Sequence, residues 1–293
     1  MTASPSDDLA GKVVVVTGGT AGIGKETAVE LAARGATVVL TARDAAKGSA
    51  TLAEVRERSG SDAVSVGELD LADLASVRAF ADRMLSDHDR LDVLVNNAGA
   101  IFPMRTETAD GFESTFGVNH LGHFLLTTLL LDRLRASAPA RIVTVSSFGH
   151  RFTLGMNWND LQSEHGRYIA MVAYGQSKLA NILFTVELAR RLEGSGVTAN
   201  CAHPGAVRSN FGSEYYVGAV GRVVDAGAAI VLISAAAGAR TSVFLAADPS
   251  VAQETGGYWV RRRRHKPSLA ARNPESARRL WTISEDLVAR AAE

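Results

Sequence analysis

The chain has 293 residues, and its 31 lysine and arginine residues balance 31 aspartate and glutamate residues, so the formal net charge is zero. This balance argues against general electrostatic binding to nucleic acid or to an anionic membrane. A single cysteine, Cys201, excludes an intramolecular disulfide framework, and the spacing of histidine and cysteine suggests no metal site. With 46% hydrophobic and 21% charged residues, the composition is that of a globular protein rather than a disordered chain.

The first residues predict neither a signal peptide nor a membrane anchor. Residues 1–9 are polar and include Asp7 and Asp8, which a secretory signal would exclude. The longest stretch without charged side chains, 114–131, contains Asn119, His120 and His123, and therefore predicts a buried helix rather than a membrane span. We expect a cytoplasmic protein in which residues 1–10 form a disordered tail.

Short apolar runs alternate with longer helical patterns from end to end. The apolar runs predict strands at 13–16, 37–41, 64–69, 93–96, 142–146 and 197–202, with 256–260 as a candidate seventh. The helical patterns fall at 22–34, 45–59, 74–88, 112–135 (one long helix or two) and 174–192. This alternation predicts an α/β fold: one doubly wound, mostly parallel sheet of about seven strands, with helices on both faces. No repeat or linker divides it, so we expect a single domain over residues 11–293.

A glycine-rich segment follows the first predicted strand and opens the first predicted helix. It reads Thr17-Gly18-Gly19-Thr20-Ala21-Gly22-Ile23-Gly24, with the key glycines at 18, 22 and 24. Glycines there let the backbone turn tightly and approach a pyrophosphate, and the helix N-terminus offers free N–H groups and a positive dipole end. A plain strand–helix turn also uses such glycines, but this context favours dinucleotide binding in a Rossmann-type fold.

The end of the second predicted strand bears on which dinucleotide binds. Where an acidic residue would bind the adenosine ribose and repel a 2′-phosphate, the chain has Arg43, followed by Asp44. The planar guanidinium of Arg43 can pair with a phosphate and stack on adenine, whereas Asp44 can equally cap the next helix. We therefore favour NADP over NAD.

Tyr174 and Lys178 are four residues apart, so both project from one face of a helix. A neighbouring ammonium would stabilise the tyrosine phenolate and lower its pKa from about 10, which suits a proton donor and acceptor in carbonyl–alcohol chemistry. Such pairs are also common on solvated helix faces, so this one gains weight only from the motifs around it.

Those motifs resemble, in order and approximate spacing, the short-chain dehydrogenase/reductase family over residues 9–287. They are the glycine-rich segment, Asp70, Asn96-Asn97-Ala98-Gly99, Asn119, Ser146-Ser147, Tyr174-Gly175-Gln176-Ser177-Lys178 and Pro204-Gly205. More narrowly, Ala271-Arg272-Asn273 and the wide gap between Ser147 and Tyr174 look like the retinol dehydrogenase-like branch.

The resemblance implies roles for four catalytic residues. Tyr174 would exchange a proton with the substrate oxygen, and Ser147 would polarise the substrate carbonyl. Lys178 would bind the nicotinamide ribose and hold the Tyr174 pKa down, and Asn119 would position Lys178 through a water. Asn97 is equally suited to tying strands together. The implied cofactor contacts are Gly18, Thr20, Gly22, Ile23, Gly24, Arg43, Asp70, Leu71, Asn97, Ala98, Gly99, Tyr174, Lys178, Pro204, Gly205, Val207 and Ser209.

Together these features predict an NADP-dependent oxidoreductase that interconverts an alcohol and an aldehyde or ketone on a small hydrophobic substrate (retinoid-like, lipid-like or xenobiotic). We expect a substrate flap at 206–221 and apolar pocket walls from Phe148, Phe152 and Met156. Two alternatives remain open: a non-catalytic dinucleotide-binding regulatory protein, and a reductase of a conjugated carbon–carbon double bond, as in the similar protochlorophyllide reductases.

Three other features receive no catalytic role. His120 and His123 lie one helical turn apart, and we interpret them as packed or hydrogen-bonded side chains rather than metal ligands. The run Arg261–Arg264 is interpreted as a solvated turn. The apolar-faced helices at 112–135 and 174–192 are candidate surfaces for a homodimer.

Overall fold

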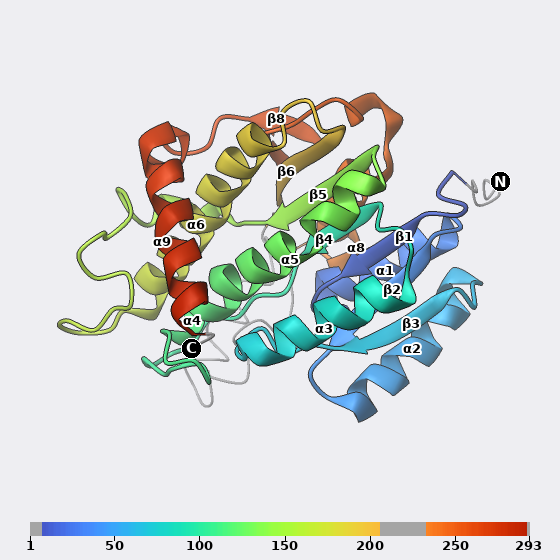
Figure 1. The fold of residues 1–293 in the computed structure, drawn as a ribbon, viewed down its shortest axis with the longest axis horizontal. Helices are drawn as coiled ribbons and strands as arrows, with labels where there is room; N and C mark the ends of the chain where they lie inside the picture. Colours follow the sequence, from blue (N-terminus) through green and yellow to red (C-terminus); the bar gives the residue numbers. More distant parts are fainter. Residues whose placement is uncertain (1–7, 206–232, 292–293) are drawn as a thin grey trace.

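The computed structural model describes residues 8–205 and 233–291. Within them, eight strands form one sheet in the order β3-β2-β1-β4-β5-β6-β7-β8 (Figure 1). Strands β1 to β7 run parallel, which confirms the predicted doubly wound sheet, and β8 adds an antiparallel strand at the edge. The strands are β1 (Val13–Val16), β2 (Thr37–Ala42), β3 (Val64–Glu68), β4 (Val93–Asn96), β5 (Ala140–Val145), β6 (Val197–His203), β7 (Tyr258–Val260) and β8 (Arg263–His265).

Helices cover both faces of this sheet, and each face has its own hydrophobic core. Strand β1 illustrates the division, because Val14 and Val16 point into one core and Val13 and Val15 into the other. The first core lies beneath α1 (Gly22–Ala33), α2 (Ala45–Ser59) and α8 (Ala235–Ala247). The second lies beneath α3 (Leu74–Asp87), α5 (Gly122–Ala136), α6 (Ala170–Arg191) and α9 (Pro274–Arg290).

The predicted helix over 112–135 is broken into three segments. A single turn, α4 (Ser114–Phe116), leads into a π-helical segment, η1 (Gly117–Leu121), and then into α5. The carboxylate of Glu113 caps the first turn by accepting from the amides of Thr115 and Phe116. The π-helical turn contains Asn119, and such turns frequently occur at functional sites.

The C-terminal helix α9 packs along α6 and touches the start of α5 (Figure 1). Its Trp281 is only 4% exposed, with its ring centroid 5.0 Å from that of Phe124 on α5 and 5.8 Å from that of Phe184 on α6. The parts of α5 and α6 around Phe124 and Phe184 are therefore covered within the chain, and the pairing of two subunits stays a prediction. The sequence did not signal this, because it does not show which surface an amphipathic helix will cover.

Arginine residues occupy both edges of the sheet. At the β3 edge, Arg56 donates to the Val64 carbonyl at 2.8 Å, and Arg83 donates to the Glu68 carbonyl at 2.7 Å. At the opposite edge, the predicted solvated turn is confirmed for Arg261 and Arg262, whose φ angles are +49° and +61°. The two arginines that follow belong instead to β8 and are exposed.

Part of the segment that we expected to be an N-terminal tail contacts the rest of the chain. Residues 8–10 are described, and Leu9 is 6% exposed, with its amide donating to the Arg34 carbonyl at 3.0 Å. These three residues therefore do not belong to the expected tail, and the rest of that tail lies outside the described residues. Over residues 8–205 and 233–291, no helix combines the length and apolar composition needed to cross a bilayer.

Candidate active site

The predicted site residues gather at the carboxyl ends of the parallel strands. The glycine-rich segment follows β1, Asn97 follows β4, Ser147 lies two residues after the end of β5, and Pro204 follows β6. Ligands of open α/β sheets bind at these ends, where loops from neighbouring strands diverge. Val207, Ser209 and the expected flap at 206–221 lie outside the described residues.

The glycine-rich segment has the close approaches that require glycine. Gly18 and Gly22 have φ angles of +64° and +53°, in the left-handed region that glycine tolerates. A Cβ atom on Gly24 would lie 2.3 Å from the Gly18 carbonyl oxygen and 2.4 Å from Nδ2 of Asn97. The backbone therefore forms a tight cradle that any larger residue at Gly24 would break.

The first turn of α1 suits a pyrophosphate. Helices α2 and α3 begin with Asp44 and Asp73, whose carboxylates accept from first-turn amides. The N-cap residue of helix α1 is Ala21, which has no side chain that could cap the helix, and the first turn of α1 holds no acidic residue. A helix start of this kind leaves N–H groups and the positive dipole end for an anion. Thr20 and Ile23, on either side of Gly22, are only partly buried. The residues present therefore fit a dinucleotide phosphate.

The residues after β2 divide the two roles that the sequence left open. The Asp44 carboxylate accepts from the Lys47 amide at 2.9 Å and caps α2. Arg43 is exposed beside it. After β2, the side chain that remains available to contact a phosphate is therefore the guanidinium of Arg43.

The residues expected near the adenosine are partly committed to the protein itself. Asp70 accepts from the Ala72 amide at 2.9 Å, and the Leu71 side chain is buried against α5. Asn97 donates to the Thr17 carbonyl at 2.8 Å, which is the strand-tying role that we considered for it. Ala98 packs close to Gly18, because a Cβ on that glycine would come within 2.9 Å of the Ala98 Cα.

Tyr174 and Lys178 project from α6 into the same region. Lys178 Nζ lies 5.7 Å from the centroid of the Tyr174 ring and donates to the Val145 carbonyl at 3.2 Å. Lys178 is 3% exposed, and burial lowers its pKa to about 8. Sequence reasoning missed Asn181, which donates to the same Val145 carbonyl at 3.1 Å. The available signal was its polar side chain on the buried face of this helix, almost one turn after Lys178.

Ser147 and Tyr174 form the other half of this group. The Ser147 side chain is placed to stabilise the Tyr174 phenolate, which lowers the Tyr174 pKa. Burial opposes this effect and is larger, so the pKa of Tyr174 is raised above its ordinary value. In the chain alone, burial is thus the larger influence on Tyr174, and the lowering of its pKa by Lys178 stays a prediction. Ser147 Oγ also accepts from the Gly149 amide at 3.1 Å.

Asn119 connects this group to the loop after β4. Its Oδ1 accepts from the Ala100 amide at 2.7 Å, and its Nδ2 donates to the Ala100 carbonyl at 2.9 Å and to Ser177 Oγ at 3.0 Å. Ser177 in turn donates to the Tyr174 carbonyl at 2.8 Å. A Cβ on Gly99 would lie 3.2 Å from both Asn119 Oδ1 and Lys178 Nζ. The structure therefore brings all four predicted catalytic residues into one place.

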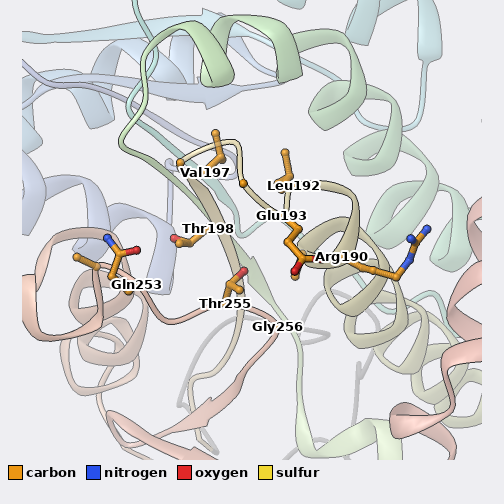
Figure 2. A pocket seen from close by; sticks show the side chains of 12 residues that line it. Arg190, Leu192, Glu193, Val197, Thr198, Gln253, Thr255 and Gly256 are labelled. Carbon is orange, nitrogen blue, oxygen red and sulfur yellow. The ribbon is translucent and has the colours of Figure 1, made fainter.

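A separate pocket of about 550 Å³ lies at the other end of the strands, where β6 begins. Figure 2 shows Arg190, Leu192 and Glu193 at the end of α6, with Val197 and Thr198 at the start of β6, around this hollow. None of the predicted catalytic residues lines it.

The two histidines of 114–131, which we interpreted as packed or hydrogen-bonded side chains, have different partners. His120 is hydrogen-bonded to Ser284 Oγ at 2.8 Å, and His123 to Thr17 Oγ1 at 2.9 Å.

Comparison with known proteins agrees with this geometry. The family model for short chain dehydrogenase matches residues 12–157. Retinol dehydrogenase 12 of Mus musculus is 46% identical over 281 residues, covering 96% of this chain and 87% of that protein. Retinol dehydrogenase 11 of Homo sapiens is 47% identical, covering 96% and 86%.

Two solved structures extend the comparison to the fold. An uncharacterised protein from Mycobacterium paratuberculosis is 39% identical with a TM-score of 0.78, covering 98% of this chain and 96% of that one. The RhlG/NADP complex of Pseudomonas aeruginosa is 27% identical with a TM-score of 0.70, covering 87% and 96%. The chain therefore belongs to the short-chain dehydrogenase/reductase family of oxidoreductases, in its retinol dehydrogenase-like branch.

Proposed function

We propose that the protein is an NADP-dependent oxidoreductase that interconverts an alcohol and an aldehyde or ketone on a hydrophobic substrate, with Tyr174 as the acid and base. The observation that carries this proposal is the convergence of Tyr174, Ser147 and Lys178 beside an uncapped, glycine-lined helix start. A protein that only bound a dinucleotide would need the cradle but not the hydroxyl pair.

Each residue has a role that follows from its position. The Tyr174 hydroxyl donates its proton to the substrate oxygen during reduction and accepts one back during oxidation. Ser147, whose side chain acts on the Tyr174 hydroxyl, donates to the same oxygen and polarises the carbonyl. Lys178 provides a buried positive charge beside the tyrosine ring and a donor for a ribose hydroxyl. When bound, the nicotinamide dinucleotide supplies the hydride, and its oxidised form adds positive charge near the phenol.

The preference for NADP rests on Arg43. Its neighbour Asp44 is used to cap α2, so an exposed guanidinium remains for a 2′-phosphate. The NADP complex of RhlG is consistent with this preference in a related fold. A charge-assisted contact of this kind contributes about 1.5–3 kcal/mol.

The preference for a hydrophobic substrate rests on aromatic side chains next to Ser147. Phe148 and Phe152 are 54% and 49% exposed, with their ring centroids 6.1 Å apart. Met156, which we expected to join them, is buried in the core and is not an exposed wall. Relatives named retinol dehydrogenases support an apolar alcohol or aldehyde as the substrate class.

The proposal is tested by NADPH oxidation with a panel of apolar aldehydes and ketones, comparing the wild type with Tyr174→Phe. We expect turnover in the wild type and its loss in the variant, with NADPH still bound. Product analysis identifies the reduced bond, so a saturated carbonyl product would replace this proposal with carbon–carbon double-bond reduction. Tight NADPH binding without turnover on any substrate would favour the regulatory alternative.

The cofactor preference has its own test. Arg43→Ala should weaken NADPH binding by roughly 10- to 100-fold and leave NADH binding nearly unchanged, since only NADPH carries the 2′-phosphate. Arg34→Ala, which removes a partly buried arginine beyond the other end of α1, is the matched control. Equal losses for both dinucleotides in Arg43→Ala would contradict the assignment.

A further inference from the structure

Two buried histidines contact the backbone of the predicted catalytic residues. His123 Nδ1 lies 3.2 Å from the carbonyl oxygen of Asn119, and His150 Nδ1 lies 2.6 Å from that of Ser147. The two side chains are 1% and 0% exposed. Neither histidine has a role in the reaction proposed above.

The partners of His150 determine where its proton lies. Its Nε2 accepts from the Ser268 backbone amide at 3.2 Å, and a backbone amide can only donate. Nε2 therefore carries no proton, and the ring is the neutral tautomer protonated at Nδ1. That proton is donated to the Ser147 carbonyl, which also accepts from the His150 amide at 3.3 Å.

The partners of His123 lead to the same tautomer. Thr17 Oγ1 accepts from the amides of Asn97 and Ala98, at 2.9 and 3.0 Å, which occupies both of its lone pairs. The single proton of the Thr17 hydroxyl then has two acceptors within reach, the Val95 carbonyl at 3.3 Å and His123 Nε2 at 2.9 Å. The contact at the other ring nitrogen decides the tautomer: Nδ1 lies 3.2 Å from the Asn119 carbonyl, which can only accept, so the proton of His123 is on Nδ1.

Both carbonyls belong to irregular backbone. Asn119 lies in the π-helical segment η1, and Ser147 is the N-cap of a 3₁₀ turn, η2 (Phe148–Arg151). The backbone of π-helical and 3₁₀ turns departs from the α-helical hydrogen-bond pattern, and such turns often occur at functional sites. His123 also links η1 to the loop after β4 through Thr17, and His150 links Ser147 to the C-terminal segment.

We propose that His123 and His150 are positioning residues, each acting as a neutral imidazole that holds the backbone carbonyl of a catalytic residue through Nδ1–H. His123 sets the orientation of Asn119 relative to the dinucleotide cradle, and His150 sets that of Ser147 relative to Tyr174. The effect on kcat rests on the proposed function, whereas the tautomers and contacts of the two histidines do not. Burial lowers the pKa of both rings, to about 3 for His123, in keeping with a ring that stays neutral. A nearby cation adds to this effect in each case, Lys178 for His123 and Arg151 for His150.

The tautomers are tested without any assay of activity. Long-range ¹H–¹⁵N spectra of histidine-labelled protein distinguish an Nδ1–H ring from an Nε2–H ring and from an imidazolium. We expect two non-titrating Nδ1–H signals between pH 5.5 and 8, one lost in His123→Asn and the other in His150→Asn. An Nε2–H signal that disappears in His123→Asn or in His150→Asn, or titration of either of these two rings in this range, would overturn the proposal.

The positioning role is tested with three substitutions at each histidine. Asparagine places an N–H at the same number of bonds from the backbone as Nδ1, glutamine places an oxygen acceptor at the distance of Nε2, and phenylalanine keeps only the ring. We expect the asparagine variants to retain kcat close to the wild type. The glutamine and phenylalanine variants should lose on the order of 10- to 100-fold in kcat with little change in KM or NADPH affinity, because reacting groups are displaced.

A structural role alone would give a different ranking. The three substitutions would then reduce activity in proportion to their loss of thermal stability, and asparagine would rescue no better than glutamine; that result overturns the proposal. His165→Gln, at an exposed histidine, is the matched control. If the wild type turned over no carbonyl or alcohol, the proposed function would fail, while the tautomer spectra would still support or overturn the proposed contacts.

Discussion

The contact between Gly149 and Tyr174 provides a direct test of how sensitive the site is to the position of the tyrosine ring. A Cβ atom on Gly149 would lie 2.8 Å from Cε1 and 3.0 Å from Cδ1 of that ring. Non-bonded carbon atoms pack at about 3.5–4.0 Å, so the ring in Gly149→Ala must move by roughly 0.7–1.2 Å, or the turn must move away from it. Displacement of a reacting group by 1 Å can cost on the order of 100-fold in rate.

We therefore expect Gly149→Ala to reduce kcat by about 10- to 100-fold, with NADPH affinity nearly unchanged because the cradle is not touched. Steady-state kinetics and NADPH fluorescence titration measure the two quantities, and urea unfolding measures any loss of stability. Gly155→Ala is the control, since a Cβ at Gly155, six residues along the chain, meets nothing within 4 Å. Unchanged kcat in Gly149→Ala, or an equal loss in Gly155→Ala, would refute the reasoning.

Three further predictions concern stability, each measured by unfolding. Trp281→Ala should lower the free energy of unfolding by about 3–5 kcal/mol, because it removes the contact of α9 with Phe124 and Phe184 and leaves a cavity. Trp158 is less buried and is the control, so a loss in Trp281→Ala no larger than that in Trp158→Ala would contradict this prediction. Replacing Arg261 and Arg262 by Asn-Gly should raise the free energy of unfolding by about 1 kcal/mol, because both arginines have positive φ angles in a two-residue hairpin turn. An unchanged urea midpoint would argue against backbone strain in this turn. Burial lowers the pKa of His120 to about 3, so between pH 6.5 and 3 the unfolded chain binds a proton that the folded chain does not. Stability should therefore fall as the pH drops through this window, and less steeply in His120→Phe; parallel pH curves would exclude His120 as a cause.

Most of the sheet and the order of the site motifs could be predicted because they depend on local patterns. The β-branched run 13–16 and the glycines at 18, 22 and 24 are dictated by neighbours in sequence, and the structure has the strand and the cradle where expected. Strand β8 was missed because an arginine-rich run has no apolar alternation, and its pairing depends on the position of β7.

Features that depend on distant residues could not be predicted. The direction of the Tyr174 pKa shift follows from how deeply the ring is buried, which no spacing of tyrosine and lysine reveals. Met156 was expected in the pocket because it is apolar and close to Ser147 in sequence, yet it is buried in the core. The roles of His123 and His150 depend on Thr17 and Ser268, which lie more than one hundred residues from them in sequence.

The arginines at the two edges of the sheet have a consequence for how the protein behaves at high concentration. An exposed edge strand offers unpaired carbonyls and amides on which a strand of another molecule can add, and this is a common route to aggregation. Here the outward carbonyls of Val64 and Glu68 are already occupied by guanidinium groups, and the opposite edge is a three-residue strand of exposed Arg263, Arg264 and His265. A second molecule approaching either edge meets positive charge like its own, so the sheet is protected against growing beyond the single chain.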